Sequence, residues 1–235
     1  MKKLLQSITK EEWLIATAVG LLAYLLYSNS GKGGSAKNTR KSVKNKNPKS
    51  ILILGDSYSV SPPAFTWSSL VKKDLAEKGI TVDVIAKSGE TTEWMLKKLT
   101  EALKTKKYDR IYVWGGTNDA VPTSPSIPTE KIIGNFQKMS DLAKENNSDL
   151  FILKGYVFDG YFSIDKLMLS GYKLTREQWE QVSRNIKNIK AKLNKDNIKN
   201  VNFVEEFNLG DKTGDGSHPN GEAHKIIAKA VLETI

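Results

Sequence analysis

The chain has 235 residues, of which 39% are hydrophobic and 26% charged, values normal for a globular protein with a buried core. It contains no cysteine, which excludes disulfide bonds, thiolate metal sites and cysteine nucleophiles. The formal net charge is +10, but residues 31–49 carry +7 of it and residues 50–235 only +2, so the charge does not indicate a domain that binds nucleic acid specifically.

Residues 13–27 form an uncharged apolar segment with Trp13 at one end and Tyr24 and Tyr27 at the other. The segment is somewhat shorter than the roughly 20 residues that span a bilayer, but its terminal aromatic residues suit the two membrane interfaces. We predict that residues 1–28 are a retained, single-pass membrane anchor. A cleaved signal peptide and a buried core helix are the alternative interpretations.

Residues 29–49 are rich in Gly, Ser, Asn and Lys and have almost no apolar side chains. Such a segment cannot bury enough surface to offset the entropy lost when it becomes ordered. We therefore predict a flexible basic linker, and a basic segment next to an apolar one is typical of chains that lie against anionic lipid headgroups.

From residue 50 onward, short apolar runs alternate with segments of helical periodicity. The predicted strands span residues 51–54, 81–85, 110–114, 150–153 and 201–204. The predicted helices span residues 66–78, 92–105, 128–145, 176–193 and 220–234. This alternation predicts an α/β domain over residues 50–235: a flavodoxin-like three-layer α/β/α sandwich with a five-stranded parallel sheet.

Polar segments that contain glycine follow four of the predicted strands, at residues 55–59, 86–90, 115–119 and 213–219. In an open parallel sheet the functional site lies at the carboxyl ends of the strands. We therefore expect these four segments, although far apart in the sequence, to form one site.

Four blocks within these segments occur in a recognisable order: Gly-Asp-Ser at 55–57, Gly89, Gly-Thr-Asn-Asp at 116–119 and Asp-Gly-Ser-His at 215–218. Together they resemble the SGNH hydrolases, also called GDSL-like lipases and esterases. The resemblance extends over residues 50–235 and implies a serine-dependent ester hydrolase. Each block alone is weak, and the specificity comes from having all four in order at strand ends.

The resemblance implies that Ser57 is the nucleophile, His218 its base and Asp215 the group that orients the imidazole. A serine hydroxyl needs such a base before it can attack a carbonyl carbon. The implied oxyanion hole consists of the backbone N–H groups of Ser57 and Gly89 and the side-chain amide of Asn118. Each such donor stabilises the transition state by about 3 kcal/mol. The implied chemistry requires neither a cofactor nor a metal.

The same residues also fit roles other than catalysis. Ser57 alone fits a helix N-cap, and Asn118 with Asp119 fits a turn. Asp56 is assigned a structural role, and His224 is interpreted as an ordinary surface or partly buried residue of the last helix. Asp215 and His218 without a third nearby ligand do not indicate a metal site.

Tyr156, Phe158 and Tyr161 follow the fourth predicted strand, in a loop predicted to be irregular up to about residue 173. Aromatic side chains beside a nucleophile often line a substrate pocket, and long loops near sites tend to be functional. We predict that these three residues bind substrate, and a lid packed only for stability is an equal alternative.

Family members cleave acetyl groups from glycans, acyl chains from lipids, and thioesters. We expect an O-acetyl or short-acyl esterase that acts on a cell-envelope polysaccharide and is held near it by residues 13–27. The alternatives are a lysophospholipase or thioesterase working at the membrane, and a non-catalytic binding module of an envelope or virion. The basic linker favours a cytoplasmic position for the domain, whereas an envelope substrate favours the opposite side, so both orientations stay open.

Overall fold

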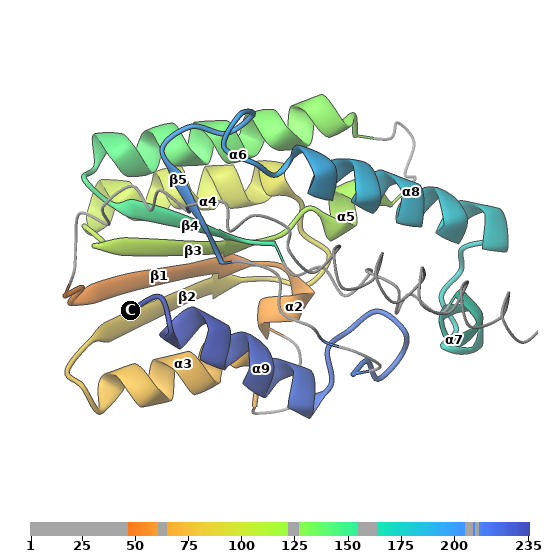
Figure 1. The fold of residues 1–235 in the computed structure, drawn as a ribbon, viewed down its shortest axis with the longest axis horizontal. Helices are drawn as coiled ribbons and strands as arrows, with labels where there is room; N and C mark the ends of the chain where they lie inside the picture. The colour runs from red at the N-terminus through yellow and green to blue at the C-terminus, as the bar shows by residue number, and fades with distance from the viewer. Residues whose placement is uncertain (1–46, 61–64, 122–126, 155–163, 205–208, 210–211) are drawn as a thin grey trace, which may run out of the picture. The chain divides into compact units, whose positions relative to one another are not determined.

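The computed structural model of the protein describes residues 47–60, 65–121, 127–154, 164–204, 209 and 212–235 (Figure 1). The predicted anchor and most of the predicted linker lie outside these residues. Among the helices that the structure does describe, none is both long and apolar enough to cross a membrane.

Five parallel strands form a single sheet. They are β1 (Ser50–Gly55), β2 (Thr81–Ala86), β3 (Arg110–Trp114), β4 (Asp149–Leu153) and β5 (Val201–Val204). Their order in the sheet is β2-β1-β3-β4-β5. Residues 51–54 of β1, an interior strand, are fully buried because helices cover both faces, which is why this strand is a continuous apolar run in the sequence.

Helices cover the sheet on its two faces and produce three layers (Figure 1). On one face lie α3 (Trp67–Ala76) and α9 (Gly221–Leu232), which pack against each other. On the other face lie α4 (Thr92–Thr105), α6 (Thr129–Glu145) and α8 (Arg176–Lys192). The predicted five-stranded, flavodoxin-like sandwich is therefore confirmed.

The strand order reverses at β1, because the chain passes from β1 outward to β2 and then back across to β3. The connecting helices α3 and α4 consequently lie on opposite faces (Figure 1). A crevice for ligands is expected at the carboxyl ends of the strands where such a reversal occurs, here β1 and β3.

Three short helices lie near this edge: α2 (Ser57–Val60), α5 (Thr117–Ala120) and α7 (Ile164–Leu169). The prediction of an irregular loop up to residue 173 is wrong where α7 forms. This helix buries Leu167 completely and packs against α8. With six residues it is too short to show a helical repeat, so tertiary packing rather than sequence pattern determines it.

Candidate active site

Ser57 begins helix α2 immediately after strand β1. The turn between them closes with a hydrogen bond of 3.0 Å from Ser59 N to the carbonyl oxygen of Asp56. A Cβ atom at Gly55 would lie 2.2 Å from Ser59 Oγ and 3.1 Å from the carbonyl oxygen of Trp114. Glycine at position 55 is therefore required for α2 to turn this closely against β3, and the turn places Ser57 at the sheet edge.

A tight loop before α9 carries Asp215 and His218. Asp215 Oδ1 accepts hydrogen bonds from the backbone N–H groups of Ser217 at 2.9 Å and His218 at 2.7 Å. Gly216, between Asp215 and Ser217, has φ +89°, a left-handed conformation that favours glycine. The loop is thus an Asx-type turn whose own aspartate side chain fixes its shape.

These two segments bring Ser57, His218 and Asp215 into one chain of hydrogen bonds. His218 Nε2 lies 3.0 Å from Ser57 Oγ, and His218 Nδ1 lies 2.8 Å from Asp215 Oδ2. The serine and histidine are 161 positions apart in the sequence. The side chains of His218 and Asp215 remain 30% and 31% exposed, so a substrate can reach them.

The surroundings of Asp215 keep its carboxylate ionised. Burial alone would raise the pKa of Asp215, but hydrogen bonds from the His218 ring, from two backbone N–H groups and from the Tyr172 hydroxyl hold it well below its usual range. A permanent negative charge beside Nδ1 favours the tautomer in which Nδ1 carries the proton, which leaves Nε2 free to accept one from Ser57.

The remaining predicted residues lie on the neighbouring strand ends. Asn118 belongs to α5, directly after β3, and its Nδ2 donates to the carbonyl oxygen of Glu90 at 2.9 Å. The same nitrogen lies 3.4 Å from Asp56 Oδ2. Gly89 precedes Glu90 in the turn after β2 and has φ +79°. The amide of Asn118 is therefore held between the Gly89 turn and the residue that precedes Ser57.

A buried network that we did not predict fixes α5 against the start of α4. Asp119 accepts hydrogen bonds from Thr92 N at 2.9 Å and Thr92 Oγ1 at 2.5 Å, and Asn135 Nδ2 donates to Thr92 Oγ1 at 2.9 Å. Burial raises the pKa of Asp119. Asp119 thus anchors the short helix that carries Asn118.

Asp56 and Tyr58 flank Ser57 and are both buried. Asp56 Oδ1 accepts a hydrogen bond from Tyr58 N at 3.1 Å, and burial raises the pKa of Asp56 to about 7. The Tyr58 ring packs against Trp114, with centroids 5.0 Å apart, and against His218, with centroids 5.4 Å apart. These contacts agree with the structural role predicted for Asp56.

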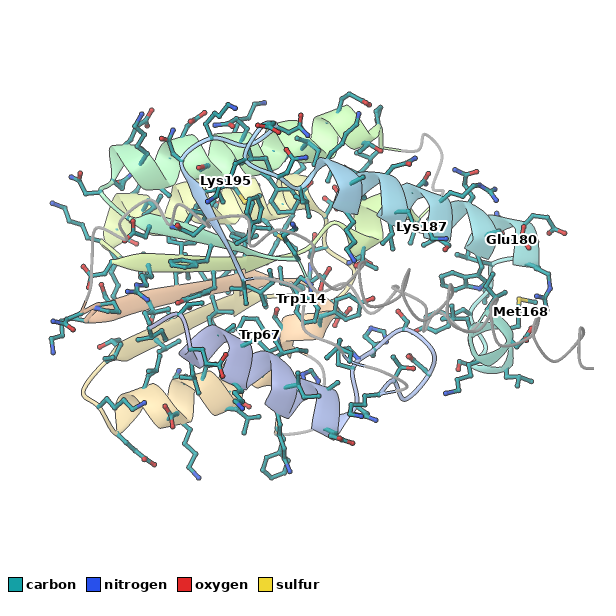
Figure 2. The ribbon with its side chains drawn as sticks, viewed as in Figure 1. Trp67, Trp114, Met168, Glu180, Lys187 and Lys195 are labelled. Carbon is teal, nitrogen blue, oxygen red and sulfur yellow. The ribbon has the colours of Figure 1, made fainter. Side chains whose placement is uncertain are left out.

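Trp67 and His224 are two further buried residues near the site. Trp67, at the start of α3, packs edge-to-face on Trp114 with centroids 6.2 Å apart (Figure 2). His224 in α9 is 1% exposed, and its Nδ1 accepts a hydrogen bond of 3.3 Å from Trp67 N. The prediction of a surface or partly buried residue is therefore wrong, because the packing of α9 against α3 buries His224 fully and its ring joins the two helices.

Tyr172 contacts the site from a segment that sequence reasoning did not connect with it. Its hydroxyl donates to Asp215 Oδ2 at 2.8 Å. No motif or strand end pointed to this residue. The predicted substrate residues Tyr156, Phe158 and Tyr161 lie outside the described residues. Within the part of the chain that the structure describes, no three His, Asp or Glu side chains form a group suited to a metal ion.

Three solved structures show the same fold. The esterase EstA from Pseudoalteromonas sp., inhibited by monoethylphosphonate, is 18% identical with a TM-score of 0.54 over 79% of this chain and 95% of its own. The acetyl xylan esterase AlAXEase is 16% identical with a TM-score of 0.58 over 79% and 99%. A catalytic mutant of Axe2, an acetylxylan esterase from Geobacillus stearothermophilus, is 16% identical with a TM-score of 0.53 over 79% and 93%.

The family itself is identified by sequence. No curated protein matches the chain. Residues 51–231, which are most of the chain, match the family model of GDSL-like lipases and acylhydrolases. The chain therefore belongs to the GDSL-like lipase/acylhydrolase family and is a carboxylic ester hydrolase.

Proposed function

We propose that this enzyme is an O-acetyl or short-acyl esterase that acts on a cell-envelope polysaccharide, with Ser57 as its nucleophile. The continuous hydrogen-bond chain from Ser57 through His218 to Asp215 carries the proposal. The similarity to two acetylxylan esterases supports an acylated polysaccharide as the substrate class.

In the proposed reaction, Ser57 Oγ attacks the ester carbonyl carbon while His218 Nε2 takes the hydroxyl proton. The resulting oxyanion accepts hydrogen bonds from the N–H groups of Ser57 and Gly89 and from the Asn118 amide. His218 then gives the proton to the departing sugar oxygen, which leaves an acyl-enzyme on Ser57. Water, deprotonated by His218, attacks the acyl carbon, and His218 returns that proton to Ser57 Oγ as the carboxylic acid is released.

Residues 13–27 anchor the enzyme to a membrane in this proposal and keep it near its substrate. The uncharged apolar run with aromatic ends supports this, as does the basic segment that follows it.

A second candidate, a lysophospholipase or thioesterase that removes longer acyl chains at the membrane, has one specific observation in its favour. Met168 and Leu169 at the end of α7 are 43% and 87% exposed, although both are apolar. Helix α7 lies beyond the carboxyl ends of the strands (Figure 1), and Ser170, which follows it directly, contacts the backbone of Asp215. Apolar side chains beside an active site suit a long acyl chain.

Hydrolysis of p-nitrophenyl esters of increasing acyl length, measured beside Ser57→Ala, tests the serine mechanism and separates the two candidates. Ser59→Ala is a matched control, because Ser59 lies in the same helix and its buried hydroxyl has no hydrogen-bond partner among the described residues. We expect wild type and Ser59→Ala to be active and Ser57→Ala to be inactive, with acetate preferred. A preference for long chains would favour the second candidate, and equal rates for wild type and Ser57→Ala would refute the serine mechanism.

A further inference from the structure

The Asp215 carboxylate has a fourth hydrogen-bond donor besides the two backbone groups and the His218 ring. The Tyr172 hydroxyl donates to Asp215 Oδ2 at 2.8 Å, and its oxygen lies 3.2 Å from His218 Nδ1. Tyr172 therefore contacts both members of the Asp–His pair at the atoms through which they contact each other.

Tyr172 is held in this position by the corner between α7 and α8. Its ring packs edge-to-face on Trp179 of α8, with centroids 5.5 Å apart and planes at 85°. Ser170 Oγ donates to the backbone carbonyl of Asp215 at 3.1 Å. Gly171 between them has φ +78°, which permits the sharp turn that directs both neighbours to the same loop.

Helix capping and burial stabilise the two sides of this corner. Thr175 caps the helix through a reciprocal capping box with Gln178. Leu167 of α7 is fully buried on the other side of the corner. The ring that carries the Tyr172 hydroxyl therefore packs against an element whose start is well capped.

A carboxylate has about four acceptor positions, two on each oxygen. In Asp215, Oδ1 receives Ser217 N and His218 N, and Oδ2 receives His218 Nδ1 and Tyr172 Oη. Tyr172 therefore supplies the donor that completes the set. Without it, Oδ2 would be held by His218 alone on the side that faces the reaction.

We propose that Tyr172 is a positioning residue of the active site, which fixes the Asp215 carboxylate and limits how strongly it attracts the imidazolium of His218. The inference rests on the proposed role of Ser57, His218 and Asp215. Burial and the hydrogen bond to Asp215 raise the pKa of Tyr172, so the hydroxyl stays protonated and remains a donor wherever the enzyme works.

Two consequences follow from this contact. A hydrogen bond to a carboxylate withdraws part of the negative charge that stabilises the neighbouring imidazolium. Removing the hydroxyl therefore strengthens the attraction between the Asp215 carboxylate and the imidazolium, and we expect the acid limb of the kcat/KM profile to move to higher pH. Loss of the fourth donor also lets the carboxylate reorient, which lowers kcat without changing how substrate binds.

The test compares Tyr172→Phe with Ser170→Ala in the full chain, with wild type and Ser57→Ala measured beside them. Phenylalanine keeps the ring on Trp179 and removes only the hydroxyl. Ser170→Ala removes a contact from the same corner to the same loop, but that contact reaches the backbone and not the carboxylate. Steady-state hydrolysis of p-nitrophenyl acetate is recorded as a function of pH, and the melting temperature of each variant is measured.

For Tyr172→Phe we expect kcat to fall about five- to tenfold, as for one lost hydrogen bond, with KM nearly unchanged and the acid limb at higher pH. Ser170→Ala should keep the wild-type pH profile. A wild-type kcat and pH profile for Tyr172→Phe would overturn the inference. Equal losses in both variants without a change in pH profile would also overturn it, because docking of the corner would then explain the effect. If wild type is no more active than Ser57→Ala, the proposed function itself fails.

Discussion

Replacing Asp215 by asparagine keeps the shape of the side chain but turns one acceptor oxygen into a nitrogen that donates two hydrogens. The new amide then has two possible orientations in the site. In the first, its oxygen remains on the backbone N–H groups of Ser217 and His218, and its nitrogen faces His218 Nδ1 and Tyr172. In the second, the two atoms exchange places.

The second orientation sets the amide nitrogen against two backbone donors, which lie 2.9 and 2.7 Å from the present oxygen. Leaving each of these N–H groups without an acceptor costs about 1–3 kcal/mol. The first orientation is therefore favoured. In the first orientation the amide nitrogen of the variant side chain donates a hydrogen bond to His218 Nδ1. Because Nδ1 must then accept, the proton of the neutral ring moves to Nε2.

With a proton on Nε2, His218 donates to Ser57 Oγ and cannot take its hydrogen. The reaction then depends on a rare tautomer, and the same change in another Ser-His-Asp enzyme lowers kcat about 10⁴-fold, equivalent to roughly 5.5 kcal/mol. We expect a loss of this size for Asp215→Asn, with no recovery at higher pH.

The measurement is kcat for p-nitrophenyl acetate, with circular dichroism to show that the variant is folded. Asp74→Asn provides a matched control, because Asp74 is an exposed aspartate of α3 paired with Lys78. We expect it to behave as wild type. A folded Asp215→Asn enzyme with kcat within about tenfold of wild type would refute the tautomer argument.

Three further outcomes are expected. Asn118→Ala should lower kcat about 10²- to 10³-fold with little change in KM, because it removes one oxyanion donor. Burial lowers the pKa of His224 to about 4, so below about pH 6.5 the unfolded chain binds a proton that the folded chain does not bind. The free energy of unfolding should therefore fall between about pH 6.5 and about pH 4, by an amount on the order of 3 kcal/mol. The melting temperature of His224→Gln should depend less on pH over this range. The full chain should sediment with membranes and need detergent for release, whereas a variant lacking residues 1–28 should remain in the supernatant.

Each of these outcomes has a result that contradicts it. An unchanged kcat for Asn118→Ala would remove its amide from the oxyanion hole. If the stability of His224→Gln falls as steeply with decreasing pH as that of wild type, groups other than His224 control the loss of stability in acid. A full chain that stays in solution without detergent would contradict the anchor.

The interior strands were predictable because the sheet buries them on both faces. Strand β3 covers residues 110–114 as its run of buried residues predicted, and the edge strand β5, although only partly buried, covers the predicted residues 201–204. Helix α7 was not predictable, since six residues with one buried leucine show no repeat. The formation of α7 depends on α8, which follows it in the sequence and provides the surface against which Leu167 is buried.

The site was predictable where its residues directly follow strands. Ser57 and Asn118 come within a few residues of the ends of β1 and β3, and the topology of a parallel sheet brings such positions together. The network of Asp119, Thr92 and Asn135 was not predictable, because three polar residues spread over three helices have no distinguishing pattern. Only the packing of α4 against α6 and α5 places them in contact.

The two oxygens of Asp215 differ in whether their hydrogen-bond donors could be predicted from the sequence. Both donors to Oδ1 come from residues two and three positions later, so a short Asp-x-x-His segment is sufficient to form that half of the arrangement. Oδ2 also receives a donor from Tyr172, 43 positions earlier, which no local segment can provide. A substitution at Tyr172 should therefore leave the turn around Oδ1 intact and alter only the side of the carboxylate that faces His218. For this reason an effect of Tyr172→Phe on the pH profile can be attributed to the Asp–His pair and not to a collapsed loop.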